Sequence, residues 1–330
     1  MPSSWEPADS TVLVTGAQGF IGSWLAERLL DAGARVVVPR RDFEPDARFR
    51  TDGVEERCVI AAADIQDYAA MTRVLEEHAV DSVFHLAAQT IVGTANRSPL
   101  STFEANVRGT YVVLEACRAA GVVGGSIDRI VVASSDKAYG AHDELPYRED
   151  FALRPTFPYD VSKACTDMIA RSFAATYDLP VAVTRFANVY GGGDLNWSRI
   201  VPDTCRSLIA GDAPAIRSDG TPQRDYLYVE DAVDAYLAIA ASLDDERWRG
   251  RAWNAGWGSP LAVREIVDRL IGVAGSDAVA DVRGDGTPHG EIDRQYLDSS
   301  AIRAELGWEP RVGLDEGLRR TYDWYVRRLG

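Results

Sequence analysis

Tyr159 and Lys163 stand four residues apart in the stretch Tyr-Asp-Val-Ser-Lys. At the start of a helix this spacing turns both side chains to the same face. A free tyrosine titrates near pH ~10, but a neighbouring ammonium favours the phenolate and lowers the pKa toward working pH. The pair therefore predicts a phenol that can accept the proton of an alcohol. The alternative is a surface pair on an amphipathic helix, which the spacing alone does not exclude.

A glycine-rich turn near the N-terminus follows a predicted strand. Residues 11–15 read as a buried parallel strand and lead into a G-x-x-G-x-x-G turn over 16–22. A periodic helix over 23–32 and a second apolar strand over 34–38 complete a βαβ unit. Such glycines permit a tight turn and let a pyrophosphate approach the N-terminus of the helix. The turn therefore predicts a dinucleotide site, with a purely structural turn as the alternative.

Strand and helix signals continue to alternate through the first half of the chain. The further segments are a strand at 58–60, a helix at 68–78, a strand at 82–84, a helix at 99–120 and a strand at 129–132. This alternation predicts an α/β fold with a doubly wound parallel sheet, whose ligands collect at the carboxyl ends of the strands. After residue 184 the pattern becomes irregular, which suits a smaller C-terminal lobe.

Further segments match one family in their order along the chain. They are Asp64-Ile65, residues 84–89, Asn106-Val107-Arg108-Gly109-Thr110, residues 134–140, 158–163 and 185–191, Arg224-Asp225-Tyr226, and Leu306-Gly307-Trp308. With the glycine turn they resemble the extended short-chain dehydrogenase/reductase family of nucleotide-sugar epimerases and dehydratases, over nearly the whole chain. The resemblance implies a Rossmann-type NAD(P)-binding domain at 1–180 and a nucleotide-sugar-binding lobe at 181–330. It also implies partial interleaving, with some strands after residue 180 returning to the first sheet.

The resemblance implies roles for the residues that could carry the chemistry. Tyr159 would take the proton of a sugar 4-hydroxyl, and Lys163 would tune the phenol and hold the nicotinamide ribose. The C4 hydride would move to the cofactor. Ser135, at the end of the strand at 129–132, would hydrogen-bond to the oxygen being oxidised. The alternative for Ser135 is a strand-end serine that bonds its own backbone.

Asp136 and Lys137 bear on the steps after the oxidation. Simple 4-epimerases usually carry small residues at these positions, whereas a 4,6-dehydratase must also remove the C5 proton and expel the C6 hydroxyl, which needs a base and an acid. Ser-Asp-Lys resembles the CDP-glucose 4,6-dehydratases, in which lysine occupies the base position. An amine is a base only when neutral, and the adjacent carboxylate opposes that state. A solvated Asp–Lys pair is the alternative.

Three functions therefore stay open. The first is an NDP-hexose 4,6-dehydratase with a CDP-glucose-like substrate. The second is a UDP-sugar 4-epimerase that uses Ser135, Tyr159 and Lys163 alone, and Arg224-Asp225-Tyr226 resembles the UDP-sugar enzymes. The third is a non-catalytic dinucleotide-sensing protein, against which the intact Ser135, Tyr159 and Lys163 argue.

The resemblance implies an NAD(P) site and a nucleotide-sugar site. The cofactor site would comprise Gly16, Gly19, Phe20, Ile21, Gly22, Arg40, Arg41, Asp42, Asp64, Ile65, Leu86, Ala87, Ala88 and Asn106, with Tyr159 and Lys163. A carboxylate after the second strand is typical of NAD enzymes and an arginine of NADP enzymes, so Asp42 favours NAD while Arg40 and Arg41 keep NADP possible. The substrate would meet Gln89, Tyr139, Asn188, Arg199, Arg217 and Arg224, since arginine suits a diphosphate.

Composition narrows the possible partners. With 46% hydrophobic residues, a chain of 330 residues can bury a large core. A formal net charge of −15 argues against nucleic-acid or membrane-surface partners, which are polyanions. Four cysteines without regular spacing disfavour zinc or disulfides and suggest a cytoplasmic protein. The helices at 99–120 and 159–177 carry apolar residues on more than one face, and the family pairs these helices, so we predict a homodimer through a four-helix bundle.

Overall fold

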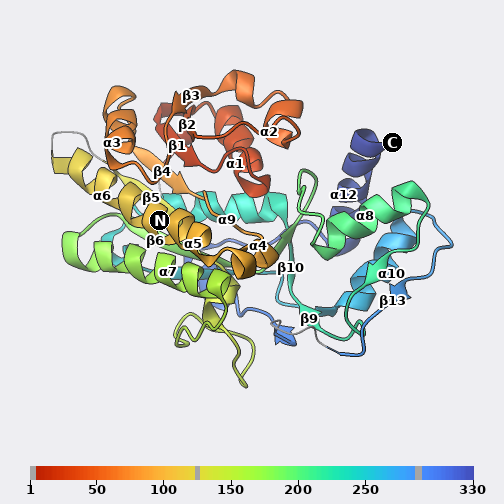
Figure 1. Ribbon diagram of the computed structural model, residues 1–330. Helices are drawn as coiled ribbons and strands as arrows, with labels where there is room; N and C mark the ends of the chain where they lie inside the picture. The colour runs from red at the N-terminus through yellow and green to blue at the C-terminus, as the bar shows by residue number, and fades with distance from the viewer. Residues whose placement is uncertain (1–4, 123–126, 287–291) are drawn as a thin grey trace.

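The computed structural model describes residues 5–122, 127–286 and 292–330 (Figure 1). Seven parallel strands form the central sheet in the order β11-β6-β5-β4-β1-β2-β3. They are β1 (Thr11–Thr15), β2 (Arg35–Arg40), β3 (Val59–Ala62), β4 (Ser82–His85), β5 (Arg129–Ala133), β6 (Val181–Phe186) and β11 (Ala252–Ala255). The predicted doubly wound parallel sheet is confirmed. Strand order reverses between β1 and β4, which is where such sheets bind ligands.

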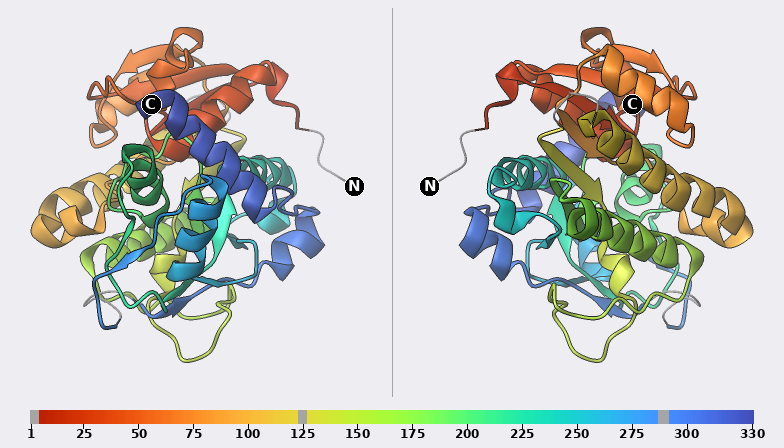
Figure 2. Two further views of the ribbon diagram at one scale, coloured as in Figure 1. Left: turned by 90° about the vertical axis from the view of Figure 1, so that its right-hand side faces the viewer. Right: turned by 90° about the vertical axis from the view of Figure 1, so that its left-hand side faces the viewer.

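The sheet lies between two layers of helices. On one face are α1 (Phe20–Asp31), α9 (Val229–Ser242) and α11 (Ser300–Leu306), and on the other are α3 (Tyr68–Glu77), α6 (Gly109–Val122) and α7 (Pro158–Tyr177). Both faces of the central strands are buried, because successive residues such as Val12 and Leu13 point to opposite faces and enter different hydrophobic clusters. The right-hand view of Figure 2 shows α9 on one side of the sheet and α6 and α7 on the other.

Two strands of the central sheet come from the second half of the chain. β6 pairs with β5, and β11 pairs in parallel with β6 at the edge. The remaining segments after β6 form a second lobe. Its elements are β7 (Asn188–Tyr190), α8 (Ile200–Ala210), β8 (Ala215–Ile216), β9 (Gln223–Arg224), β10 (Tyr226–Tyr228), β12 (Leu261–Ala262), α10 (Val263–Val273), β13 (Asp281–Val282), β14 (Arg294–Gln295) and α12 (Leu314–Leu329). Its core joins α8, α10 and α12 (Figure 1).

The helix expected over 99–120 is built from three segments. α5 (Pro99–Phe103) passes into a π-helical turn at Glu104–Arg108 and then into α6. A π turn inserts an extra residue into a helix and is frequent near functional sites. Shorter helices are α2 (Arg48–Thr51), α4 (Val92–Arg97) and the 3-10 turns at Pro7–Asp9, Glu55–Arg57, Asp136–Tyr139 (η4) and Glu246–Trp248. Within the described ranges, none of these helices has the length and apolar character needed to cross a bilayer.

Candidate functional site

A cavity of about 1630 Å³ opens beyond the carboxyl ends of β1, β4 and β5. Its walls come from both halves of the chain, with the glycine turn and η4 contributed by the first half and α8 and β9 by the second. A cavity of this size is larger than the usual 300–1,000 Å³ of a single small-molecule pocket. It can therefore accommodate two ligands.

The glycine turn leaves backbone exposed at one end of this cavity. Gly16 has a φ of +74°, and a Cβ there would lie 2.7 Å from the Ala87 nitrogen. At Gly22 a Cβ would lie 2.2 Å from the Gly16 oxygen, so this glycine lets α1 pack against the turn. Gly16, Gly19 and Gly22 all line the cavity, as do Phe20 and Ile21 in the first turn of α1. A helix N-terminus behind a glycine turn attracts phosphate groups.

The residues after β2 point in different directions. Arg41 and Asp42 line the cavity, where Arg41 forms ion pairs with Asp42 at 2.6 Å and with Asp64 at 3.5 Å. Arg40 instead forms an ion pair with Glu55 and does not line the cavity, which differs from its expected place in the cofactor site. Arg40, the last residue of β2, and Arg41 therefore have different partners although they are adjacent in sequence.

Ser135, Tyr159 and Lys163 meet on one wall. The Ser135 hydroxyl donates to Asp136 Oδ1 at 3.0 Å and accepts from the Lys137 backbone nitrogen at 3.2 Å, so it also caps η4. Tyr159 and Lys163 lie in the first turns of α7 and both line the cavity. Lys163 Nζ donates to the Ala133 carbonyl at 2.8 Å, and burial lowers the pKa of Lys163 to about 8.

The electrostatic setting of Tyr159 differs from the expectation. Burial raises the pKa of Tyr159 to about 12, and Arg199 is the cation that opposes this rise most, followed by a hydrogen bond with Ser135. Lys163 is not among the largest influences on this pKa, and its ammonium donates to the Ala133 carbonyl. Arg199 lines the cavity and forms an ion pair with the buried Asp194 at 2.9 Å. In this structure Arg199 and Ser135 are thus the groups that lower the pKa of Tyr159 against the rise caused by burial.

Asp136, Lys137 and Asp160 lie together beside the tyrosine. All three line the cavity, and the two carboxyl groups are each only 4% exposed. Burial raises the pKa of Asp136, and it raises the pKa of Asp160 to about 6, while Lys137 opposes both shifts. Asp160 has no role among the sequence-based predictions, although an acid directly after the tyrosine in the first turn of a helix was a usable signal.

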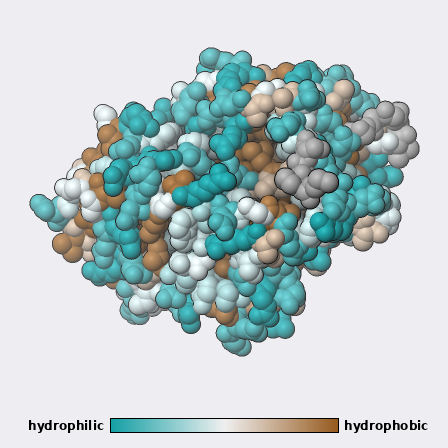
Figure 3. Space-filling view, turned by 180° about the vertical axis from the view of Figure 1, so that it is seen from behind, coloured by the Kyte–Doolittle hydropathy of each residue, from teal (hydrophilic) through white to brown (hydrophobic). Residues whose placement is uncertain are grey.

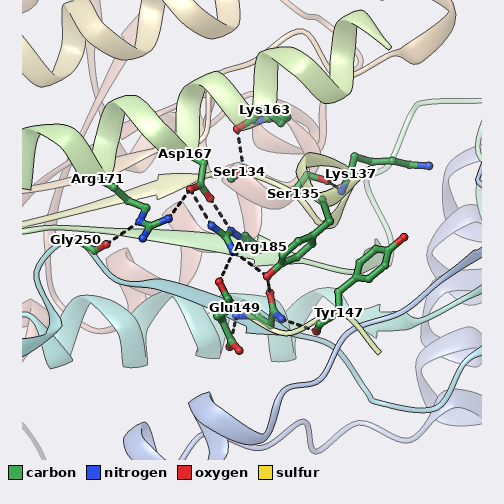
Figure 4. Close-up of polar contacts among 12 residues, drawn as sticks. Ser134, Ser135, Lys137, Tyr147, Glu149, Lys163, Asp167, Arg171, Arg185 and Gly250 are labelled. Atoms are coloured by element: carbon green, nitrogen blue, oxygen red, sulfur yellow. Dashed lines mark hydrogen bonds and ion pairs between the residues drawn. The ribbon is translucent and has the colours of Figure 1, made fainter. Parts of the chain in front are cut away.

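Behind the site, a buried ion pair joins α7 to β6 (Figure 4). Arg185 is 1% exposed and binds the fully buried Asp167 through two contacts, at 2.7 and 3.0 Å. Arg185 also donates to the Tyr139 hydroxyl at 2.9 Å, and that hydroxyl donates to Asn254 Oδ1 at 2.7 Å. Tyr139 is fully buried and is not among the residues that line the cavity. It instead connects η4 to the Arg185–Asp167 pair.

Asn106 also lies outside the cavity. Its side chain accepts from the Gln89 nitrogen at 2.7 Å and donates to the Gln89 carbonyl and to the Ser162 hydroxyl. It therefore fixes the loop after β4 against α7.

His85 connects β4 to β1 and α6, because its ring forms hydrogen bonds with the Thr15 hydroxyl at 2.8 Å and the Thr110 hydroxyl at 3.2 Å. Burial lowers the pKa of His85 to about 3, so this ring is neutral.

The other expected residues are found on the cavity wall. On the cofactor side these are Asp64, Ile65, Leu86, Ala87 and Ala88, and on the substrate side Gln89, Asn188, Arg199, Arg217 and Arg224. The three arginines supply positive charge in a strongly acidic chain, as a diphosphate requires.

Lys137 and Lys163 are the only lysines among the 330 residues. Both line the cavity, while every other long basic side chain is an arginine. Arginine stays protonated at any working pH. Amine chemistry on a side chain is thus confined to this site.

Curated proteins similar to this chain include both dehydratases and epimerases. A CDP-glucose 4,6-dehydratase of Salmonella typhimurium is 31% identical over 95% of this chain and 90% of its own length. A UDP-glucose 4-epimerase of Mycolicibacterium smegmatis is 32% identical over 95% of this chain and 97% of its own. The chain spans about half, 47%, of a trifunctional UDP-glucose 4,6-dehydratase, epimerase and reductase of Arabidopsis thaliana, at 30% identity over 96% of this chain.

A solved structure shares the fold at similar identity. DesIV, a dTDP-glucose 4,6-dehydratase from Streptomyces venezuelae crystallised with NAD bound, superimposes with a TM-score of 0.86 and 30% identity, covering 97% of both chains. Residues 12–256 match the NAD dependent epimerase/dehydratase family, a span that includes the glycine turn, Ser135, Tyr159 and Lys163. The chain therefore belongs to the NAD dependent epimerase/dehydratase family.

Proposed function

We propose that the chain is a nucleotide-sugar 4,6-dehydratase that acts on a CDP-glucose-like substrate and forms a 4-keto-6-deoxy sugar nucleotide. Family members are NAD-dependent nucleotide-sugar dehydratases and epimerases, so the choice lies between these two reactions. The observation that carries the proposal is the presence of Asp136 and Lys137 in the same cavity as Ser135 and Tyr159. A 4-epimerase needs no acid and base at C5 and C6, whereas elimination of water needs both.

Each residue then has a task that follows from its position. Tyr159 accepts the proton of the sugar 4-hydroxyl, and Ser135 hydrogen-bonds to that oxygen. Asp136 and Lys137 supply the proton transfers that remove the C5 proton and release the C6 hydroxyl as water. Arg199, Arg217 and Arg224 bind the diphosphate, and Asn188 also lines the cavity.

The chain's own residues fit NAD at the other end of the cavity. Gly16 and Gly22 leave the close backbone approach that a pyrophosphate needs, and α1 presents its N-terminus there. Asp42 can accept from the adenosine ribose, and Lys163 can hold the nicotinamide ribose. When bound, NAD accepts a hydride from C4 and returns it to the product, so no external oxidant is needed.

Product analysis in deuterated water tests the proposal. The purified protein is incubated with CDP-, UDP-, GDP- and dTDP-hexoses, and the products are examined by NMR. We expect a 4-keto product without its C6 hydroxyl and with solvent deuterium at C5. A product that keeps its C6 hydroxyl and carries no deuterium at C5 contradicts the dehydratase.

The 4-epimerase is the second candidate. The resemblance of Arg224-Asp225-Tyr226 to the UDP-sugar enzymes favours it, as does the epimerase of Mycolicibacterium smegmatis among the relatives. In that case Ser135, Tyr159 and Lys163 suffice, and Asp136 and Lys137 serve the pocket without reacting. The same experiment then yields a sugar inverted at C4 and untouched at C5.

Asp42 provides a test of cofactor choice. We expect Asp42→Ala to weaken NAD binding about tenfold, because a hydrogen-bond acceptor for the adenosine ribose is lost. The affinity for NAD should then exceed that for NADP by a smaller factor, because the Asp42 carboxylate no longer repels the 2′-phosphate of NADP. Titration of each dinucleotide by calorimetry measures both effects. Arg40→Gln is the matched control, since Arg40 faces Glu55 outside the cavity. Loss of NADP binding in that control would instead show that Arg40 binds the 2′-phosphate.

We further propose that the chain forms a homodimer through α5, α6 and α7. Large apolar side chains are exposed on these helices, with Leu100 72% and Met168 54% exposed and Tyr111 and Tyr177 also exposed. The three helices lie side by side on the front of the molecule in Figure 1, and α5 and α6 both pack against α7. The opposite face is mostly hydrophilic, with its hydrophobic residues in small separate patches (Figure 3).

Charge placed on these helices should separate the two copies. We expect the wild type to have a dimer mass by light scattering at micromolar concentration, and Leu100→Glu combined with Met168→Glu to have a monomer mass, because two buried charges per subunit would oppose association. Val279→Glu, at a site 73% exposed in the second lobe, should stay dimeric. A monomeric wild type excludes the proposed dimer.

A further inference from the structure

Lys137 shares its part of the cavity with carboxyl groups from two different elements. Asp136 precedes it in η4, and Asp160 comes from the first turn of α7, which packs against η4. Both carboxyl groups are 4% exposed and line the cavity with Lys137. Lys137 lowers the pKa of both carboxyl groups, while Asp136 raises the pKa of Asp160. The three charges therefore influence one another within the same part of the cavity.

Such a setting favours the charged amine. A carboxylate within a few ångströms stabilises an ammonium, and a buried carboxylate without a cation is costly. If Lys137 were neutral, the mutual repulsion of Asp136 and Asp160 would be opposed at Asp136 by the Arg224 charge and by hydrogen bonds, but no longer by the charge that opposes it most. Lys163 is a useful contrast, because burial alone acts on it and lowers its pKa to about 8. The two lysines of the cavity thus have opposite surroundings.

We propose that Asp160 is a positioning residue of the elimination, which together with Asp136 holds Lys137 as an ammonium ion, so that a carboxylate and not Lys137 is the base at C5. This inference rests on the proposed dehydratase. It revises the base position that the Ser-Asp-Lys resemblance gives to Lys137. In Figure 4 the Lys137 side chain extends away from the Asp167–Arg185 pair and toward the second lobe, where the substrate arginines lie.

The proton transfers balance under this assignment. The C5–H bond breaks with its proton going to the Asp136 carboxylate, while the C5=C6 double bond forms. The C6–O bond breaks, and the hydroxyl leaves as water with a proton from the Lys137 ammonium. The carboxyl group later returns a proton to C5, and the hydride taken from C4 returns to C6. The proton that Tyr159 took from the 4-hydroxyl passes to solvent and balances the proton that Lys137 regains.

The lysine content of the chain allows a direct test. Full-length protein labelled with lysine carrying carbon-13 at Cε has two lysine signals, and Lys137→Arg assigns them. In an NMR pH titration we expect Lys137 to titrate at higher pH than Lys163. We expect Asp160→Asn to lower the Lys137 midpoint by about one pH unit, as for removal of a close opposite charge. The Lys163 midpoint should not move, which reports that the site has kept its structure.

Two further variants serve as controls for the Asp160→Asn titration. Asp160→Glu keeps the carboxylate and should restore the high midpoint, whereas Asp31→Asn removes a distant charge at the end of α1 and should change neither signal. A Lys137 that titrates below Lys163, or one that does not respond to Asp160→Asn while Lys163 is unmoved, overturns the inference. Because the titration needs no substrate, it is independent of the product analysis. A product that keeps its C6 hydroxyl would instead overturn the dehydratase and leave the titration result standing.

Discussion

Tyr159→Phe is expected to lose turnover by roughly 100- to 10,000-fold, the range typical for loss of a general base. The variant removes one hydroxyl from a side chain that is already buried, so the ring still packs at the start of α7. By contrast, the 4-hydroxyl of the sugar loses the only acceptor that the proposed mechanism gives it. Steady-state kinetics with the substrate found in the panel measures the effect.

The control for this prediction separates chemistry from binding. Tyr159→Phe should keep the melting temperature and should bind NAD nearly as tightly as the wild type, because the glycine turn and Asp42 are untouched. Tyr322→Phe, in α12 and outside the cavity, is a matched tyrosine change, and it should have the smaller effect on turnover. Near-normal turnover in Tyr159→Phe would refute the mechanism, whichever of the two reactions the protein performs.

Asp136→Asn is expected to stop the reaction after oxidation. Tyr159 and Lys163 remain, so the 4-hydroxyl can still be oxidised, but the proton transfers at C5 and C6 lose the group that pairs with Lys137. We therefore expect formation of the keto-deoxy product to fall about 100-fold or more, and reduced cofactor to accumulate when substrate is added. Stopped-flow absorbance of the reduced nicotinamide follows the first step, and NMR of the sugar follows the second.

The Asp136→Asn variant also distinguishes the 4,6-dehydratase from the 4-epimerase. A 4-epimerase makes no use of proton transfers at C5 and C6, so its Asp136→Asn variant should turn over with at most a modest loss and should not accumulate reduced cofactor. Asn can still accept the Ser135 hydroxyl that Asp136 accepts at 3.0 Å, which preserves the serine's position. Normal formation of the keto-deoxy product by the variant would show that Asp136 takes no part in the elimination of water.

Elements with strong local signals were predicted closely. The strand over 11–15 is β1 without change, and the helix over 159–177 is α7 with one more residue at its start. Continuous apolar strands and a proline at a helix start fix these boundaries through nearby residues. The π turn at Glu104–Arg108 could not be predicted, because its extra residue reflects packing against α7. The place of β11 at the sheet edge depends on contacts with β6, far away in sequence.

The site was predicted where residue type and the end of a strand decide it. Ser135 lies two residues beyond the end of β5, and it lines the cavity at the carboxyl end of that strand. Tyr139, Arg40 and Asn106 do not line the cavity, because a side chain's direction depends on partners that the local sequence does not reveal. These partners are Arg185 and Asn254 for Tyr139, Glu55 for Arg40, and Gln89 and Ser162 for Asn106.

The pairing of Arg185 with Asp167 restricts how this chain can change by single substitutions. Replacing either partner alone would strand a buried charge between β6 and α7, a change that typically costs about 3–5 kcal/mol, a large part of the stability of an ordinary domain. Replacing both by well-packed apolar residues is often neutral. Directed evolution that accumulates one mutation at a time would therefore meet a barrier at these two positions, whereas libraries that vary them together would not. Engineering of this scaffold should treat Arg185 and Asp167 as one site.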